Sequence, residues 1–144
     1  MKTMLKYQRE IIGTSDPDPE PRKTDRDKLY PETEYYGQNG HDVFKRVWPD
    51  GIPERLPLEP SLKLRNHSPT GFSWGYLGSG PSQLALALLL DATSDPEKAQ
   101  NYYQEFKQQF VAGWEDGWIF FKSDILGWLK LMEQRELKER QSKN

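Results

Sequence analysis

The stretch GFSWGYLGSGPSQLALALLL, residues 71–90, decides most of what can be expected of this chain. Glycines, three aromatic residues and Pro81 come first, and a nearly unbroken run of leucine and alanine follows. Leucine and alanine are strong helix formers, and proline suits the first turn of a helix, where a missing N–H costs nothing. Because a helix that is apolar all round must be buried, we predict a central helix that Ser79 and Gly80 cap.

Upstream of this stretch, the sequence predicts a small sheet. Two runs rich in tyrosine, valine and phenylalanine flank Asn39-Gly40, the dipeptide that most readily supplies the positive φ angles of a tight hairpin turn. The run SLKLR alternates as a strand does, and GFSWGY could add one more strand. The predicted strands cover residues 34–38, 42–48, 61–65 and, as an optional fourth, 71–76.

Downstream, the pattern changes to that of helices. Ser94 and Glu97 form a capping box ahead of apolar residues at helical spacing. Residues 118–121 are expected to be extended before Ser123 caps a third helix. The buried stripe of that third helix would consist of Ile125, Trp128, Leu129 and Met132.

Strands first and helices later is the pattern of an α+β domain. We predict a small, mostly antiparallel sheet of three to four strands in the N-terminal half, packed by about three helices in the C-terminal half. The single domain would cover residues 32–132. Residues 1–31, rich in proline and charge, are expected to form a disordered or loosely docked extension, and residues 133–144 a charged helix end or tail.

The composition excludes several classes of protein. The chain has 144 residues, a formal net charge of −2 and no cysteine. The balanced charge gives no strong signal for nucleic acid, and the lack of cysteine excludes disulfides and cysteine-based zinc sites. With two separated histidines and no calcium-loop spacing, we expect no metal and no cofactor. The longest apolar run, Leu84–Leu90, is too short to cross a membrane, so we expect a soluble, cytoplasmic protein.

One motif is typical of serine hydrolases. Residues 71–75, GFSWG, match the G-x-S-x-G elbow that places a nucleophile on a turn between a strand and a helix. The elbow needs a helix directly after Ser73 and a histidine later in the chain, but His41 and His67 both precede it. An enzyme that uses His67 with Ser73, or Asp91, therefore stands as the alternative hypothesis rather than the first.

The glycine-rich turn suggests a binding site instead. Its amides and the positive end of the helix dipole could hold a phosphate or carboxylate, although the Gly-Lys-Ser/Thr of a P-loop is missing. Capping and close backbone packing explain the same glycines without a ligand, so both interpretations stay open. Exposed aromatic rings here would add a stacking platform. The candidate ligand-binding residues are His67, Ser73, Trp74, Tyr76, Gly78, Ser79, Gly80 and Ser82.

The same stretch carries a resemblance. With YYQEFKQQFV and SDILGWL downstream, it resembles an uncharacterised family of small bacterial, archaeal and phage proteins with the signature GFxWGYxGSGPxQLALALL. The resemblance covers about Tyr35 to Leu129. It implies no activity, because the family has no assigned function. The family accepts other residues at the position of Ser73, which argues against a nucleophile there, and often has glycine where this chain has Leu77.

We therefore expect a binding or interaction module without catalytic machinery. Its ligand would be an anionic group, such as a phosphate or a nucleotide, or else a partner protein. The first alternative is the hydrolase-type enzyme described above. The second is a phage or mobile-element accessory protein that acts by direct protein binding, for which an apolar surface patch should be visible.

Overall fold

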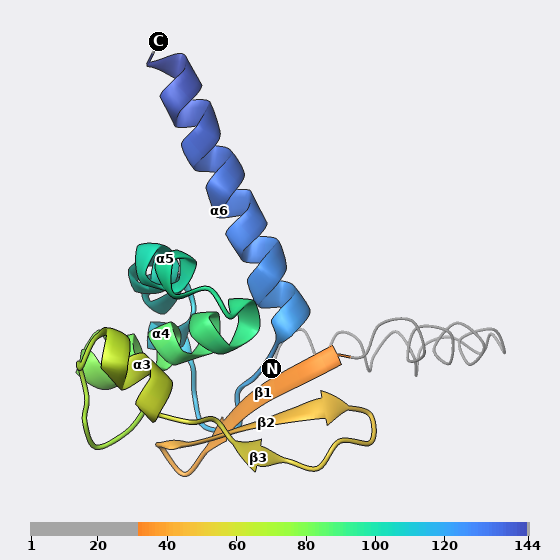
Figure 1. The fold of residues 1–144 in the computed structure, drawn as a ribbon. Helices are drawn as coiled ribbons and strands as arrows, with labels where there is room; N and C mark the ends of the chain where they lie inside the picture. The colour runs from red at the N-terminus through yellow and green to blue at the C-terminus, as the bar shows by residue number, and fades with distance from the viewer. Residues whose placement is uncertain (1–31, 144) are drawn as a thin grey trace, which may run out of the picture.

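The computed structural model describes residues 32–143. Its four strands form one sheet in the order β3-β2-β1-β4, with every neighbouring pair antiparallel. The predicted α+β architecture is confirmed: in Figure 1 the helices lie over one face of the sheet, and no helix of residues 32–143 covers the other face. In chain order the elements are β1 Glu32–Gln38, β2 Asp42–Trp48, β3 Glu54–Arg55, α3 Glu59–Leu64, α4 Ser79–Thr93, α5 Pro96–Gln109, the 3-10 helix η1 Val111–Gly113, β4 Ile119–Phe121 and α6 Lys122–Ser142.

The predicted hairpin is confirmed. Asn39 and Gly40 have φ angles of 57° and 78°, the left-handed conformation that this turn requires. Strands β1 and β2 pair along their full length, from Glu32 opposite Trp48 to Gln38 opposite Asp42. This register places alternate residues of the two strands on the same face of the sheet. It therefore decides which side chains of β1 and β2 lie next to each other on each face.

Two predicted strands are wrong. Residues 61–65 belong mostly to α3, where Pro60 occupies the first turn and the Ser61 hydroxyl donates to the Leu58 carbonyl oxygen. Residues 71–76 form no strand, because Gly71 and Gly75 adopt φ angles of 141° and 88° that break an extended run. The third and fourth strands are instead β3 and β4, and β4 lies within the segment predicted to be extended near residue 120.

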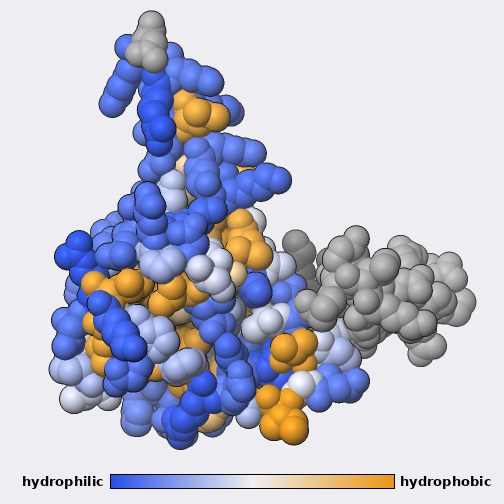
Figure 2. Space-filling model, viewed as in Figure 1, coloured by the Kyte–Doolittle hydropathy of each residue, from blue (hydrophilic) through white to orange (hydrophobic). Residues whose placement is uncertain are grey.

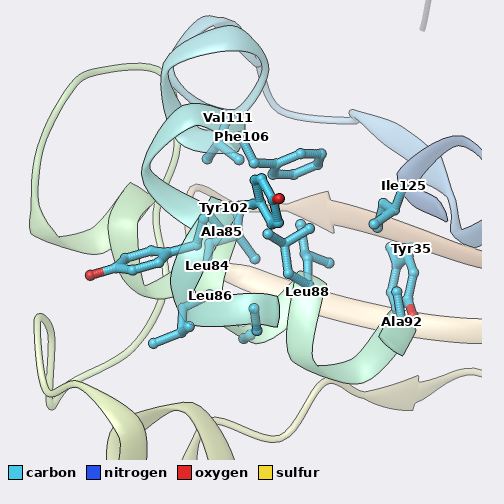
Figure 3. Close-up of a cluster of buried hydrophobic side chains, with 14 of the residues drawn as sticks. Tyr35, Leu84, Ala85, Leu86, Leu88, Ala92, Tyr102, Phe106, Val111 and Ile125 are labelled. Carbon is cyan, nitrogen blue, oxygen red and sulfur yellow. The ribbon is translucent and has the colours of Figure 1, made fainter. Parts of the chain in front are cut away.

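Helix α4 is buried on nearly every side, as predicted. Leu84, Ala85, Leu86, Leu88 and Leu89 have no exposed surface. Figure 3 shows the labelled leucine and alanine side chains of α4 between Tyr102 and Phe106 of α5 on one side and Tyr35 of β1 and Ile125 of α6 on the other. The buried helix therefore joins the helical layer to the sheet and forms the centre of the core.

The caps of the next two helices differ from the prediction. Ser94 adopts a left-handed conformation that ends α4, so it cannot also take the extended conformation of an N-cap. Asp95 is extended instead and caps α5 by accepting a hydrogen bond from the Lys98 amide at 3.1 Å. Helix α6 begins before the predicted cap, Ser123, whose amide donates to the Glu32 carboxylate of β1 at 3.1 Å.

Helix α6 packs on the domain through its first half. The predicted stripe is confirmed, because Ile125, Trp128, Leu129 and Met132 are all buried. Beyond this stripe, α6 runs on to Ser142 and extends away from the body, with mainly hydrophilic residues on its surface (Figures 1 and 2). The predicted extension at residues 1–31 lies outside the described residues. Among residues 32–143, no helix combines the length and apolar character needed to cross a membrane.

Candidate functional site

The glycine-rich loop packs tightly around the first turn of α4. Gly78 is extended and serves as the N-cap, so the predicted cap Ser79 is the first residue of the helix. A Cβ atom at Gly80 would overlap the Ser73 side chain, and it would lie only 3.2 Å from the Ser73 amide nitrogen. The Tyr76 ring lies over Gly78, where an added Cβ would be 2.9 Å from Cδ2. These two glycines therefore allow close packing.

The two aromatic residues of the predicted platform point in different directions. Trp74 is buried, lies edge-on to Trp118 at 5.7 Å and donates its indole N–H to Asp116 Oδ1 at 3.1 Å. Tyr76 is 53% exposed, and its hydroxyl lies 2.9 Å from Ser73 Oγ. Only the Tyr76 ring is therefore accessible at the surface of this loop.

The polar groups of the first turn of α4 are partly used by the fold. Ser82 is buried, and its amide and hydroxyl both donate to the Gly78 carbonyl oxygen at 3.0 Å. Ser79 is exposed, and the first turn carries no acidic side chain. The positive end of the helix dipole is therefore not compensated by a carboxylate of that turn.

His67 belongs to a separate group of contacts. Its Nε2 lies 2.7 Å from the Tyr103 hydroxyl, and its backbone amide donates to Gln83 Oε1 at 2.8 Å. Gln83 is fully buried and also accepts from the Ser68 amide, so it holds this loop against α4. The structure thus gives His67 and Ser73 different partners, and within residues 32–143 no hydrogen bond joins them.

The surroundings of His67 predict a pH dependence of stability. Burial, and then the positive charges of Lys107 and Arg65, lower the pKa of His67 below its ordinary value of 6.5. The folded protein then binds fewer protons than the unfolded chain, so the stabilising effect is present above about pH 6.5 and is lost as the pH falls through the folded-state pKa. We expect His67→Gln to flatten the fall in the free energy of unfolding below neutral pH, measured by urea titration. An unchanged slope would contradict this expectation.

A cavity of about 280 Å³ lies between α3, α4 and the segment after β3. We call it the α3–α4 groove, and Asp91 is the one charged residue among those that line it. Its apolar walls are Leu56, Pro57, Pro60, Ala87 and Leu90. The groove therefore combines an apolar surface with a single carboxylate.

Asp91 is held by residues from the sheet. The Tyr35 hydroxyl donates to Oδ2 at 2.7 Å, and Lys45 Nζ donates to Oδ1 at 2.7 Å. Lys45 Nζ also lies 3.7 Å from Glu54 Oε1. Tyr35, Lys45 and Glu54 come from β1, β2 and β3, and the strand register places them side by side on the face that α4 covers. Two carboxylates therefore share one ammonium group, and the cluster carries a net negative charge.

The side chains of this cluster are suited to binding a charged group rather than to transferring a proton. Burial, and then the hydrogen bond to Asp91, raise the pKa of Tyr35 well above its ordinary value of 10.0, so the hydroxyl stays a donor. Lys45 binds the other oxygen of Asp91, so the Asp91 side chain is held in place from both sides. No group of three histidine, aspartate or glutamate side chains in the described part of the chain is arranged to hold a metal ion.

The sequence indicated Asp91 only as an alternative candidate and did not reveal its partners. One signal for a partner was present, because Asp91 directly follows the apolar run of α4, where a charged residue needs one. The pairing of Tyr35 with Lys45 follows only from the register of β1 and β2. Residues of three strands and one helix thus form the cluster, whereas the predicted site lay within one continuous segment.

Comparison with known proteins gives a family but no activity. The model of a family of unknown function (DUF6166) matches residues 35–131, a span that begins in β1 and ends in α6. It therefore includes the glycine-rich loop and all the elements that line the α3–α4 groove. Neither the curated proteins nor the solved structures provide a match.

Proposed function

The chain belongs to a family of unknown function (DUF6166), and we propose that it is a non-catalytic binding module that holds a lysine or arginine side chain of a partner protein in the α3–α4 groove. The observation that carries this proposal is the charge of the groove. Apolar walls adjoin Asp91, and Glu54 lies beside the Lys45 ammonium that Asp91 already binds. A cation is the charge that complements this cluster.

The shape of the groove supports the same ligand. A volume of about 280 Å³ is at the lower end of what small-molecule sites offer and suits one long side chain. Lysine and arginine have an apolar stem that can lie along Ala87 and Leu90, with a charged end that can reach a carboxylate. Asp91 and Glu54 are 20% and 68% exposed, so a ligand can approach both from solvent.

Two observations favour binding over catalysis. Ser73 has no hydrogen bond to His67, so the hydrolase-type alternative lacks its base. Tyr35 stays protonated, and both oxygens of Asp91 already accept hydrogen bonds. A carboxylate that already accepts two hydrogen bonds still has free lone pairs. Asp91 can therefore accept a further hydrogen bond from a ligand.

The first turn of α4 supports a second candidate, which is the anion-binding site expected from the sequence. Ser79 is exposed there, no acidic residue lies in that turn, and Tyr76 presents its ring nearby. A phosphate would be stabilised by the helix dipole and by the first amides of the helix. This candidate predicts binding of an anion at a different place from the groove.

One titration separates the two candidates. We would follow the backbone amides of the full chain by NMR while adding N-acetyl-lysine methylamide, its norleucine counterpart or inorganic phosphate. The groove proposal predicts that the lysine probe shifts Ala87, Leu90 and Ser94 and that the norleucine probe, which has a similar stem but no charge, does so far less. The anion candidate predicts that phosphate shifts Ser79 and Gly80.

The matched variant is Glu54→Gln, which removes one charge at an exposed position. We expect it to weaken binding of the lysine probe several-fold and to leave stability nearly unchanged. Asp50→Asn provides the control, because Asp50 is an exposed acid in the turn after β2 and is not one of the two carboxylates beside Lys45. Equal shifts with the norleucine and lysine probes would contradict the groove proposal.

A further inference from the structure

The face of the sheet opposite the helices has an unusual pattern of side chains. Tyr35 points from β1 towards α4, so its neighbours on the strand point to the other side. The register then places Arg55, Phe44, Tyr36 and Ile119 in one continuous row across all four strands. A solvated face of an antiparallel sheet is normally polar, so a row of aromatic and aliphatic residues at its centre needs an explanation.

The aromatic residues of this row form an ordered stack. The Tyr36 and Phe44 rings lie 5.5 Å apart with 25° between their planes. The Arg55 guanidinium lies 5.0 Å from the centre of the Phe44 ring and is also held by Asp42 at 3.1 Å. Arg55 therefore lies at one end of the stack and Tyr36 at the other, next to Ile119 in the row.

A cavity of about 200 Å³ adjoins the Tyr36 end of the stack. It lies beside the Tyr36 ring, and Ile119, Glu34 and Arg46 also line it. Glu34 is 5% exposed, and its Oε1 accepts from Arg46 Nη2 at 3.3 Å. The wall of the cavity therefore offers the Arg46 guanidinium, a donor, next to the Glu34 carboxylate, an acceptor.

We infer that this cavity, which Tyr36 and Ile119 both line, binds the nucleobase of a free nucleotide. A base offers a flat face to continue the stack on Tyr36. Its edge carries acceptors for the Arg46 guanidinium next to amino or imino donors for the Glu34 carboxylate. This site is separate from the α3–α4 groove, so each can be tested without the other.

The charges of this face indicate a free nucleotide rather than a nucleic-acid strand. Arg46 is paired with Glu34 and Arg55 with Asp42, so their positive charges are compensated. Binding to a strand depends on neutralising several phosphates and therefore weakens steeply with salt. Recognition through the base alone predicts an affinity that changes little with salt.

The test uses the full chain and NMR titration with the four ribonucleoside 5′-monophosphates, with ribose 5-phosphate as the probe that lacks a base. We expect at least one nucleotide to shift the amides of Tyr36, Gly37 and Ile119, and ribose 5-phosphate to leave them unchanged. Equal shifts with ribose 5-phosphate, or no shift with any nucleotide, would overturn the inference. Tighter binding of a single-stranded oligonucleotide with a steep salt dependence would also overturn it in favour of a nucleic-acid surface.

Separate variants test the stacking of the base on the Tyr36 ring and the contacts of Arg46 with the edge of the base. Tyr36→Leu should raise the Kd about tenfold because it removes the stacking surface, whereas Tyr36→Phe should keep the Kd within about twofold. Arg46→Lys keeps a positive charge beside Glu34 but removes the planar guanidinium with its several donors, so binding should weaken several-fold. The matched control is Arg135→Lys on α6, which changes an arginine of the exposed Arg135–Glu105 pair. If the Arg46 and Arg135 variants bind alike, the proposed contact with the base edge is wrong.

Discussion

Replacing Gly37 by alanine is expected to lower the free energy of unfolding by about 3 kcal/mol, the upper range for adding a methyl group to a packed core. The added Cβ would lie 2.6 Å and 2.9 Å from Cε2 and Cζ2 of the Trp118 indole. That ring has no room to move, because it is 2% exposed and stacks on Trp114 at 4.2 Å. Urea unfolding followed by tryptophan fluorescence would measure the loss.

The backbone around Gly37 adds to this constraint. Its amide donates to the Trp118 carbonyl oxygen at 3.1 Å, and its own carbonyl accepts from the Gly117 amide at 2.8 Å. The matched control is Gly127→Ala in α6, where an added Cβ would meet nothing within 4 Å. That change should raise stability by about 0.5–1 kcal/mol, since alanine is the better helix former. Similar stabilities for the two variants would refute the packing described for Trp118.

Replacing Asp91 by asparagine is expected to cost about 2 kcal/mol, because one buried donor then loses its acceptor. The carboxylate accepts from Tyr35 and Lys45, both at 2.7 Å, and an amide has only one oxygen to offer them. Tyr35 has no exposed surface, so its hydroxyl cannot turn to water. Lys45 and Asp91 are both partly exposed to water, so the loss of stability should be smaller than for a fully buried ion pair.

Urea unfolding of Asp91→Asn and three further variants checks this prediction. Tyr35→Phe alone should cost about 1 kcal/mol, and the double variant should cost less than the sum, since both changes remove the same hydrogen bond. Asp50→Asn makes the same chemical change at an exposed position and should alter stability by less than about 0.5 kcal/mol. Strict additivity of Asp91→Asn and Tyr35→Phe would show that the two side chains are not coupled.

The parts of the fold that the sequence predicted well have strong local signals. Asn39 and Gly40 can both take positive φ angles, so the hairpin follows from a dipeptide and its flanks, although β1 begins at Glu32, two residues before the predicted start. The run after Pro81 is apolar on every side and long enough to exclude a strand. The stripe at Ile125 and Trp128 repeats at helical spacing, which predicted the buried face of α6.

The wrong predictions concern short segments. The five residues from Ser61 to Arg65 alternate as a strand would, but one helical turn satisfies the same pattern, and Pro60 in the first turn favours the helix. Strands β3 and β4 have two and three residues. Strands this short have almost no periodicity of their own and exist because β2 and β1 pair with them.

The sequence by itself determined the α+β class, the hairpin, the buried position of α4 and the amphipathic face of α6. Each of these depends on the conformational preferences of neighbouring residues or on periodicity within one segment, so no other part of the chain is needed to infer them. It also directed attention to the glycine-rich loop, where the structure shows that Gly78 and Gly80 allow Tyr76 and Ser73 to pack closely.

Only the tertiary structure decided which side chains meet. Asp91 binds partners 56 and 46 residues away in the chain, and the row from Arg55 to Ile119 takes one residue from each of four strands. Strand register and the packing of α4 on the sheet produce both arrangements, and a shift by one residue would turn these side chains to the opposite face. The hairpin turn sets the register of β1 against β2, whereas the positions of β3, β4 and α4 depend on pairing and packing between segments that are distant in the chain, which no local pattern in this sequence specifies.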